Sequence, residues 1–203
     1  MLLHRIKIIA ALVLVVLGMA VFVATLVRAV WYAPENSTYS LAMKSHKSIV
    51  VPKENPVHLA IPSLKIDADV QYVGVNAKGH MGVPNNFTDV AWYQDGTVPG
   101  QVGSAVIDGH VDNGLGLDGV FKHLANIKIG ESVFVTTKEG RTLRFIVSDT
   151  REYAYDAVPN EVVFNQADIV RLNLITCEGA WVAGKKTYDR RLVVYTTLQG
   201  DTP

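Results

Sequence analysis

The sequence predicts a mainly β protein, a closed eight-stranded β-barrel with short helices, preceded by one N-terminal transmembrane helix. Three observations support this prediction. An uncharged apolar run stands near the N-terminus, short β-type runs separated by turn residues follow it, and only two later segments have helical character. Many short strands with few helices among them are typical of a sheet that closes on itself.

The N-terminal apolar run covers 20 residues, 8–27, which is long enough to cross the hydrocarbon core of a bilayer. Arg5 and Lys7 precede the run, and the first acidic residue is Glu35. Positively charged flanks stay in the cytoplasm, so we expect a single-pass cell-membrane protein with an extracytoplasmic remainder. A cleaved signal peptide is the alternative, but the run exceeds the usual ~7–15 apolar residues of such peptides. We therefore assign residues 1–30 to a cytoplasmic flank and a transmembrane anchor.

Two further regions follow the predicted anchor. Segment 31–56 is polar, contains several prolines and shows no sustained hydrophobic period, so we expect an extracytoplasmic tether. The remainder, 57–203, is predicted to form one β domain.

The strands of this domain are predicted from short runs rich in β-branched and apolar residues. In chain order, the clearest runs are 57–62, 67–73, 104–107, 132–137, 142–147, 171–176 and 192–197. Turn residues at 138–141 join two of these runs into a predicted hairpin. Short helices are predicted at 119–124 and 161–168.

The net charge of zero hides a division between +3 in the first 30 residues and −3 in the rest. No basic stripe indicates a nucleic-acid partner. Cys177 is the only cysteine, so it cannot form a disulfide within the chain. An unpaired thiol outside the cell is either reactive or joined to another chain. The alternative is a small buried hydrophobic side chain without a chemical role.

Two other residue types can cooperate with Cys177. Among the six histidines, His110 stands at the end of a buried strand-like run, 103–109, before a polar loop. Catalytic groups favour such junctions because the strand fixes their position. Arg190 and Arg191 begin the last strand, and alternation points them to opposite faces. A thiol nucleophile, a histidine proton carrier and an arginine oxyanion ligand suffice for acyl transfer through a thioester.

The same histidine could also belong to a metal site. Asp112, Asp118 and His123 lie close to His110 in the sequence, but their spacing matches no zinc signature. We expect no metal and no other cofactor.

Several blocks carry a family resemblance, and they occur in a fixed order. They are 61–68, Trp92-Tyr93, Pro99-Gly100, the run Gly103 to Asp112, Gly119-Val120-Phe121, Leu174 to Cys177, and Arg191 to Tyr195. Together they resemble the sortases, the membrane-anchored cysteine transpeptidases of mainly Gram-positive bacteria, over residues 57–198. The residues Trp92-Tyr93, Pro99-Gly100 and the segment from Gly109 to Asp112 together are most similar to class F, with classes D and E as neighbours.

The resemblance implies His110, Cys177 and Arg191 as catalytic residues. Arg190 takes the role of Arg191 if the strand is shifted by one residue. The nucleophile motif of the family usually begins with threonine, whereas this chain has Asn173 there, which would alter the packing behind the nucleophile.

The implied reaction is cleavage of an LPXTG-like sorting signal at its threonine carbonyl. The acyl group would pass through a Cys177 thioester from a secreted protein to a cell-wall precursor amine. Arg191 and the backbone amide of Glu178 would hold the oxyanion, and His110 would protonate the leaving amine.

The resemblance also implies a substrate groove beside the nucleophile. Segments 149–170 and 178–190 would form its walls, and Thr176, Trp181 and Tyr188 are candidate contacts for the bound signal.

Two other functions stay open. L,D-transpeptidases also combine cysteine, histidine and arginine, but they place Ser-His-Gly directly before the cysteine, where this chain has Leu174-Ile175-Thr176. A non-catalytic membrane-tethered β domain that binds a secreted partner would keep Cys177 buried and inert. Labelling with a thiol reagent separates this last function from an enzyme, because an activated cysteine reacts fast.

Overall fold

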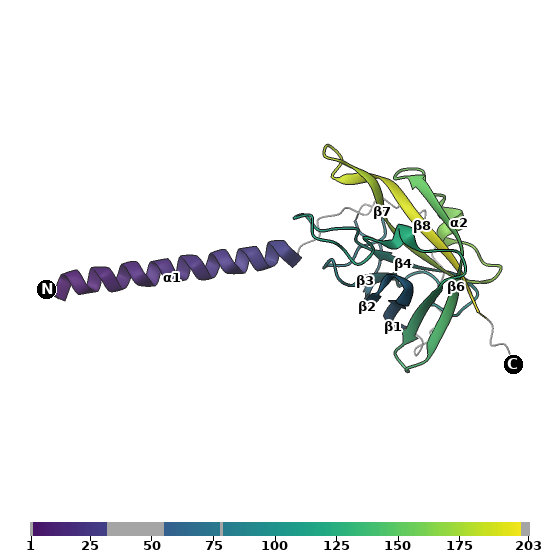
Figure 1. Ribbon diagram of the computed structural model, residues 1–203, viewed down its shortest axis with the longest axis horizontal. Coiled ribbons are helices and arrows are strands. Elements are labelled where there is room, and N and C mark those ends of the chain that lie inside the picture. Colours follow the sequence, from purple (N-terminus) through teal and green to yellow (C-terminus); the bar gives the residue numbers. More distant parts are fainter. Residues whose placement is uncertain (1, 32–54, 78, 200–203) are drawn as a thin grey trace.

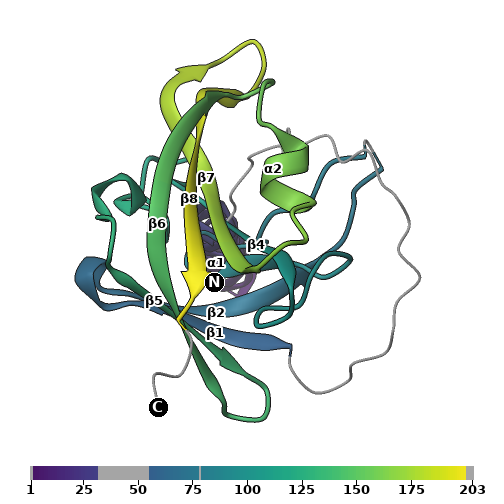
Figure 2. The same cartoon turned by 90° about the vertical axis from the view of Figure 1, so that its right-hand side faces the viewer.

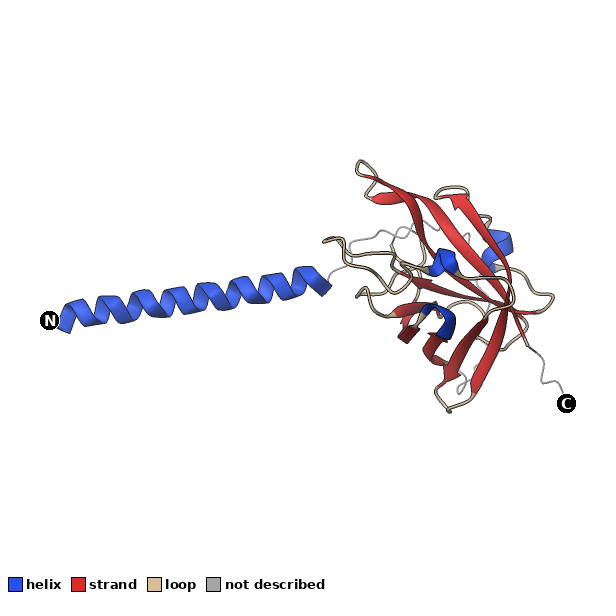
Figure 3. Ribbon diagram, viewed as in Figure 1, coloured by secondary structure: helices blue, strands red, loops and turns tan. Residues whose placement is uncertain are grey.

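The computed structural model describes residues 2–31, 55–77 and 79–199 of the chain (Figure 1). Strands dominate the part that follows the N-terminal helix (Figure 3). The elements, in chain order, are α1 (Leu2–Trp31), β1 (Pro56–Ile61), η1 (Pro62–Leu64), β2 (Ile66–Val73), β3 (Val90–Tyr93), β4 (Gly103–Gly109), η2 (Leu124–Asn126), β5 (Ser132–Thr137), β6 (Thr142–Ala154), α2 (Asn160–Phe164), β7 (Val170–Val182) and β8 (Thr187–Leu198).

The strands of the described residues form a closed barrel in the order β1–β2–β3–β4–β7–β8–β6–β5 (Figure 2). This arrangement confirms the predicted eight-stranded closed barrel. Neighbouring strands are antiparallel except for two pairs, β2–β3 and β4–β7, which are parallel. A parallel pair needs a long crossover. Between β4 and β7 the crossover contains the β5–β6 hairpin and α2, so residues distant in sequence meet on adjacent strands.

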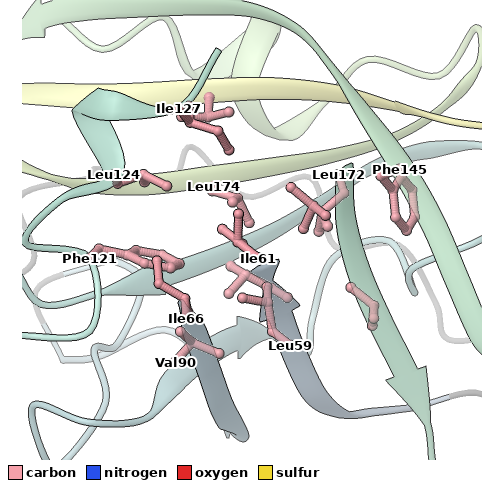
Figure 4. Close-up of a cluster of buried hydrophobic side chains, with 14 of the residues drawn as sticks. Leu59, Ile61, Ile66, Val90, Phe121, Leu124, Ile127, Phe145, Leu172 and Leu174 are labelled. Atoms are coloured by element: carbon pink, nitrogen blue, oxygen red, sulfur yellow. The ribbon is translucent and has the colours of Figure 1, made fainter. Parts of the chain in front are cut away.

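The barrel interior is filled by apolar side chains from every strand (Figure 4). Alternation is clearest in β5, where Val133 and Val135 are buried and their neighbours are only partly so. Leu172 and Leu174 of β7 belong to the same interior cluster. This packed interior leaves chemistry to the outer faces and to the ends of the strands.

Two elements differ from the prediction because tertiary contacts determine their secondary structure. All four residues of β3 are buried, so its sequence shows no alternation that would reveal a strand. The helix predicted at 119–124 is replaced by turns before η2, because the amide of Phe121 donates to the carbonyl of His110 at 2.9 Å. Gly119 fits there because a Cβ would collide with the same His110 carbonyl.

The second predicted helix, 161–168, is shorter in the structure, since α2 ends at Phe164. Beyond its end, Asp168 forms an ion pair with Arg171 at 3.0 Å instead of continuing the helix. Three strands are also longer than predicted, because β6, β7 and β8 continue past the barrel core. The extensions of β7 and β8 form a hairpin next to the candidate site, and the extension of β6 pairs with β8.

Helix α1 is long and apolar enough to cross a membrane. Its window Ala11–Arg28 has a mean hydropathy of 2.5 over 18 residues, and none of it is buried. The helix is therefore compatible with the predicted single-pass anchor. Most of the predicted tether, residues 32–54, lies outside the described residues, and its role stays a prediction.

Candidate active site

The thiol and the arginine candidates lie on neighbouring strands. Cys177 of β7 and Arg191 of β8 are direct partners in the antiparallel pair. Direct partners place their Cβ atoms about 4.5–5.5 Å apart on one face of the sheet. Both residues are buried, with 6% of Cys177 and 0% of Arg191 exposed. The thiol and a permanently charged arginine thus share one face of the sheet, in a site largely shielded from water.

His110 follows β4, on the other side of β7. The parallel β4–β7 pair ends with Asp108 opposite Ile175. One step further, the Thr176 hydroxyl donates to the Gly109 carbonyl at 2.7 Å and ties the two strands together. The next residue along each strand is His110 and Cys177, respectively, so the histidine reaches the level of the thiol.

A backbone carbonyl fixes the imidazole of His110. Its Nε2 lies 3.0 Å from the carbonyl oxygen of Pro84, in the loop between β2 and β3. A carbonyl can only accept a hydrogen bond, so Nε2 carries the proton in both charge states. Proton exchange by His110 therefore uses Nδ1. No sequence signal marks Pro84 for this role, because the interacting group is part of the backbone.

All three candidate side chains share one face of the sheet. Val106, Ile175 and Val193, one from each of β4, β7 and β8, pack in a second hydrophobic cluster outside the barrel core. Side chains an even number of residues apart on a strand point the same way. His110 is four residues from Val106, Cys177 is two from Ile175, and Arg191 is two from Val193. The three candidate side chains therefore lie on the outer face of the sheet.

The two arginines differ sharply in environment. Arg191 donates from Nη1 to the carbonyls of Tyr188 at 3.0 Å and Arg190 at 2.8 Å, and from Nη2 to the Thr187 hydroxyl at 2.6 Å. The Arg190 side chain is 53% exposed and lies 2.5 Å from Glu152 on the surface. The structure therefore places Arg191, and not Arg190, beside the thiol.

Two predicted groove residues belong to the β7–β8 hairpin. Trp181 and Tyr188 pack edge to face with their ring centroids 5.3 Å apart, and Trp181 is 47% exposed. The Tyr188 hydroxyl donates to the carboxylate of Asp112, in the loop directly after His110. This bond joins the hairpin to the loop that carries the histidine. The sequence offered Asp112 as a possible metal ligand, whereas its observed contact is structural.

Thr176 occupies the opposite face. Alternation groups it with Leu172 and Leu174 of the barrel interior, and it is 1% exposed. Its hydroxyl joins β7 to β4, as described above, so its position argues against a groove contact.

The chain bends directly after the nucleophile candidate. A bulge interrupts the β7–β8 register between Glu178 and Trp181, and Gly179 adopts a positive φ of 87° that favours glycine. The Asp189 carboxylate accepts a hydrogen bond from the Ala180 amide at 2.7 Å and fills the space that a Cβ at 179 would need. Sequence reasoning missed Asp189, although an isolated glycine in a strand is a signal for such a bulge.

The outer hydrophobic cluster extends from the candidate residues towards α2. Its buried members are Met81, Tyr93, Val106, Val163, Phe164, Ile175, Val193 and Tyr195. Burial raises the pKa of Tyr195, and a hydrogen bond with the Tyr153 hydroxyl at 3.0 Å raises it further. This tyrosine is therefore neutral at physiological pH, and it adds no charge to the outer hydrophobic cluster.

The residues weighed above as metal ligands do not gather. Asp118 and His123 form an exposed pair with 3.9 Å between carboxylate and imidazole. Across the ranges that the structure describes, no group of three or more His, Cys, Asp or Glu side chains is arranged to hold a metal.

Comparison with known proteins identifies the fold. A family model described as a sortase domain matches residues 59–199. Sortase A from Corynebacterium diphtheriae superposes with a TM-score of 0.55 at 18% identity, covering 74% of this chain and 63% of that one. Sortase C-1 from Actinomyces oris gives a TM-score of 0.54 at 21% identity, covering 72% and 75%. Sortase A from Listeria monocytogenes gives 0.54 at 19%, covering 72% and 89%.

These similarities have clear bounds. The chain spans less than two thirds of the Corynebacterium structure, and identities this low show a shared fold only. No curated protein matches the chain by sequence. The solved structures include sortases named A and C, so the resemblance to class F stays a prediction.

Proposed function

The chain belongs to the sortase family, and on this premise we propose that it is a cysteine transpeptidase whose chemistry is carried by Cys177, His110 and Arg191. One observation supports these roles above all. Cys177 and Arg191 are strand partners, and His110 lies at the level of Cys177 beside the neighbouring strand, so the three proposed roles would meet on one buried face. Acyl transfer needs these three functions and no more.

In the proposed first half-reaction, the Cys177 thiolate attacks the threonine carbonyl carbon of an LPXTG-like signal. A C–S bond forms, and the carbonyl oxygen becomes an oxyanion that the Arg191 guanidinium and the Glu178 amide stabilise. The C–N bond then breaks, and His110 gives the Nδ1 proton to the leaving amine. The products are a thioester on Cys177 and a free C-terminal peptide fragment.

The second half-reaction reverses these roles. An incoming amine attacks the thioester carbon, and neutral His110 takes up its proton at Nδ1. The C–S bond breaks, the new amide is released, and the thiolate of Cys177 returns. Since the site excludes most water, we expect an amine bound in the groove to compete well against hydrolysis.

We propose secreted proteins with a C-terminal sorting signal as substrates and a cell-wall precursor amine as acceptor. Helix α1 would anchor the enzyme with its N-terminus in the cytoplasm, and residues 31–56 would tether domain 57–203 at the outer membrane face. Segments 149–170 and 178–190 would form the groove walls. This arrangement would bring the enzyme to the membrane surface where both substrates emerge.

A second function has one observation in its favour. Cys177 is only 6% exposed, as a non-catalytic β domain that binds a secreted partner would require. An enzyme with this structure must open before a peptide reaches the sulfur. The L,D-transpeptidase alternative has no such support, because the matching family model is that of a sortase.

Trapping the acyl-enzyme separates the two functions. The full chain in detergent micelles is incubated with a library of LPXTG-like peptides, quenched with acid and weighed by intact-mass spectrometry. We expect an adduct with the mass of the peptide cut after threonine, and none with Cys177→Ala. The absence of any adduct, together with thiol labelling only after denaturation, would refute the transpeptidase and support the binding domain.

A further inference from the structure

Helix α2 is too short to be stable by its own hydrogen bonds. It has 5 residues, and its N-cap residue, Pro159, provides no side-chain cap. Isolated helices below about 12–15 residues are marginal in water, so α2 must be held by tertiary contacts. Val163 is fully buried, and Phe164 contacts Tyr93 edge to face at 6.0 Å. Such apolar contacts favour burial but do not fix direction.

One directional contact comes from the strand that carries the nucleophile candidate. The Asn173 side chain is fully buried, and its Nδ2 donates to the carbonyl oxygen of Val163 at 2.6 Å. Asn173 lies on the outer face of β7, as Cys177 does, four residues before it. At about 3.3 Å per residue, the two are roughly 13 Å apart along the strand.

The hydrogen bonding of Asn173 is not that of a side chain whose role is packing alone. The other amide atom of Asn173, Oδ1, is buried without a hydrogen-bond partner. An unsatisfied buried acceptor destabilises the fold, and an apolar side chain of the same size would avoid that cost. A threonine hydroxyl branches from Cβ, one bond earlier than the amide nitrogen, and does not extend as far towards Val163. The contact with Val163 therefore depends on the length of the asparagine side chain and on its amide N–H donor.

We infer that Asn173 is a positioning residue that holds α2 against β7 and thereby fixes one wall of the substrate groove. That a substrate groove exists here rests on the function proposed above, whereas the contact between Asn173 and α2 does not. Because Asn173 is far from the thiol, its loss should weaken binding of the sorting signal and leave the chemical step intact. The expected signature is a higher KM with a nearly unchanged kcat.

Amide hydrogen exchange tests the contact without reference to activity. The amides of Val162 and Val163 both donate to the Pro159 carbonyl, at 2.9 and 3.0 Å, so they report on α2. In the wild-type full chain we expect them to exchange at least about tenfold more slowly than in an unstructured peptide. Exchange at the unstructured rate would overturn the inference, and this measurement needs no variant.

Two variants remove the contact, and a third is a matched control. Asn173→Thr and Asn173→Ala should speed exchange in α2 by roughly three- to tenfold, the range for one net hydrogen bond. KM for a sorting-signal peptide should rise by a similar factor. Thr196→Val removes another buried bond of the same sheet, from the Thr196 hydroxyl to the Leu172 carbonyl at 2.7 Å. It acts on the barrel side, so α2 exchange and KM should keep their wild-type values.

The outcomes are distinguishable. Unchanged α2 exchange in a folded Asn173 variant would show that the residue does not hold the helix. Faster exchange with unchanged KM would confirm the contact and refute its effect on the groove. If the wild-type protein forms no acyl-enzyme with any sorting-signal peptide, the proposed function is refuted. The hydrogen-exchange results would still decide whether Asn173 holds α2.

Discussion

Replacing Arg191 by lysine tests the proposed oxyanion ligand while keeping its charge. Arg191 already uses both Nη atoms to bind two backbone carbonyls and the Thr187 hydroxyl. Those bonds fix the orientation of the planar guanidinium. A lysine ammonium is a compact charge with three donors on a flexible chain. It lacks the planar fork, and we expect that it cannot serve the same acceptors and an oxyanion together.

The structure separates the stability effect from the catalytic effect. Loss of a buried hydrogen bond from a charged donor costs about 1.5–3 kcal/mol. Domains have about 5–15 kcal/mol of stability, so a variant that loses one of the three Arg191 bonds should remain roughly 97% folded or better at 25 °C. Loss of an oxyanion donor lowers kcat by about 10²–10³-fold. Partial unfolding cannot produce a loss of that size.

The assay is kcat/KM for cleavage of a quenched fluorescent sorting-signal peptide, with thermal unfolding of the same samples. Arg190→Lys is the matched control, because Arg190 makes an exposed ion pair with Glu152 worth about 0–1 kcal/mol. We expect Arg191→Lys to lose at least about a hundredfold in kcat/KM and Arg190→Lys to lose little. A severe defect in Arg190→Lys, or near-normal activity in Arg191→Lys, would refute the assignment.

Three further outcomes are expected. Cys177→Ala should abolish turnover and keep the wild-type circular dichroism spectrum; residual peptide cleavage at the wild-type rate would exclude a thioester mechanism. His110→Ala should lose about 10²–10⁴-fold in kcat/KM, whereas His123→Ala, whose side chain is 65% exposed, should retain most activity, and equal losses would contradict the choice of histidine. The hydrogen bond from Ser63 at 2.7 Å lowers the pKa of Glu131, so its carboxylate stabilises the fold above the usual pKa of about 4.3, and this contribution is lost as the pH falls through the lowered value. The melting temperature should therefore fall less steeply between about pH 5 and 3 in Glu131→Gln than in the wild type, and parallel curves would rule out this linkage.

The positions of the candidate chemical groups follow from sequence because they depend on strand geometry. A thiol at the end of one strand-like run and a histidine at the end of another could be placed by local pattern alone. Alternation also separated Arg190 from Arg191 onto opposite faces, and the structure shows one exposed and one buried side chain. These properties need no knowledge of distant contacts.

What could not be predicted depends on groups that meet only in the folded chain. The Pro84 carbonyl carries no sequence signal, yet it orients His110. Asn173 was visible as a departure from the family motif, but its partner, Val163, is a backbone group from another element. The bond between Tyr188 and Asp112 likewise joins segments far apart in sequence. Local propensity cannot anticipate such tertiary pairs.

The burial of Cys177 has a consequence for how the proposed enzyme must work. Acylation requires access to a sulfur on a residue that is 6% exposed. The strands of the barrel cannot separate to provide it, because closure pairs each one on both sides. Access must come from segments outside the barrel ladder. They include the β2–β3 loop that carries Pro84, the loop after His110, α2 with its flanks, and the tip of the β7–β8 hairpin. The barrel then sets the geometry of the reaction, and these segments set which peptides reach it and how fast.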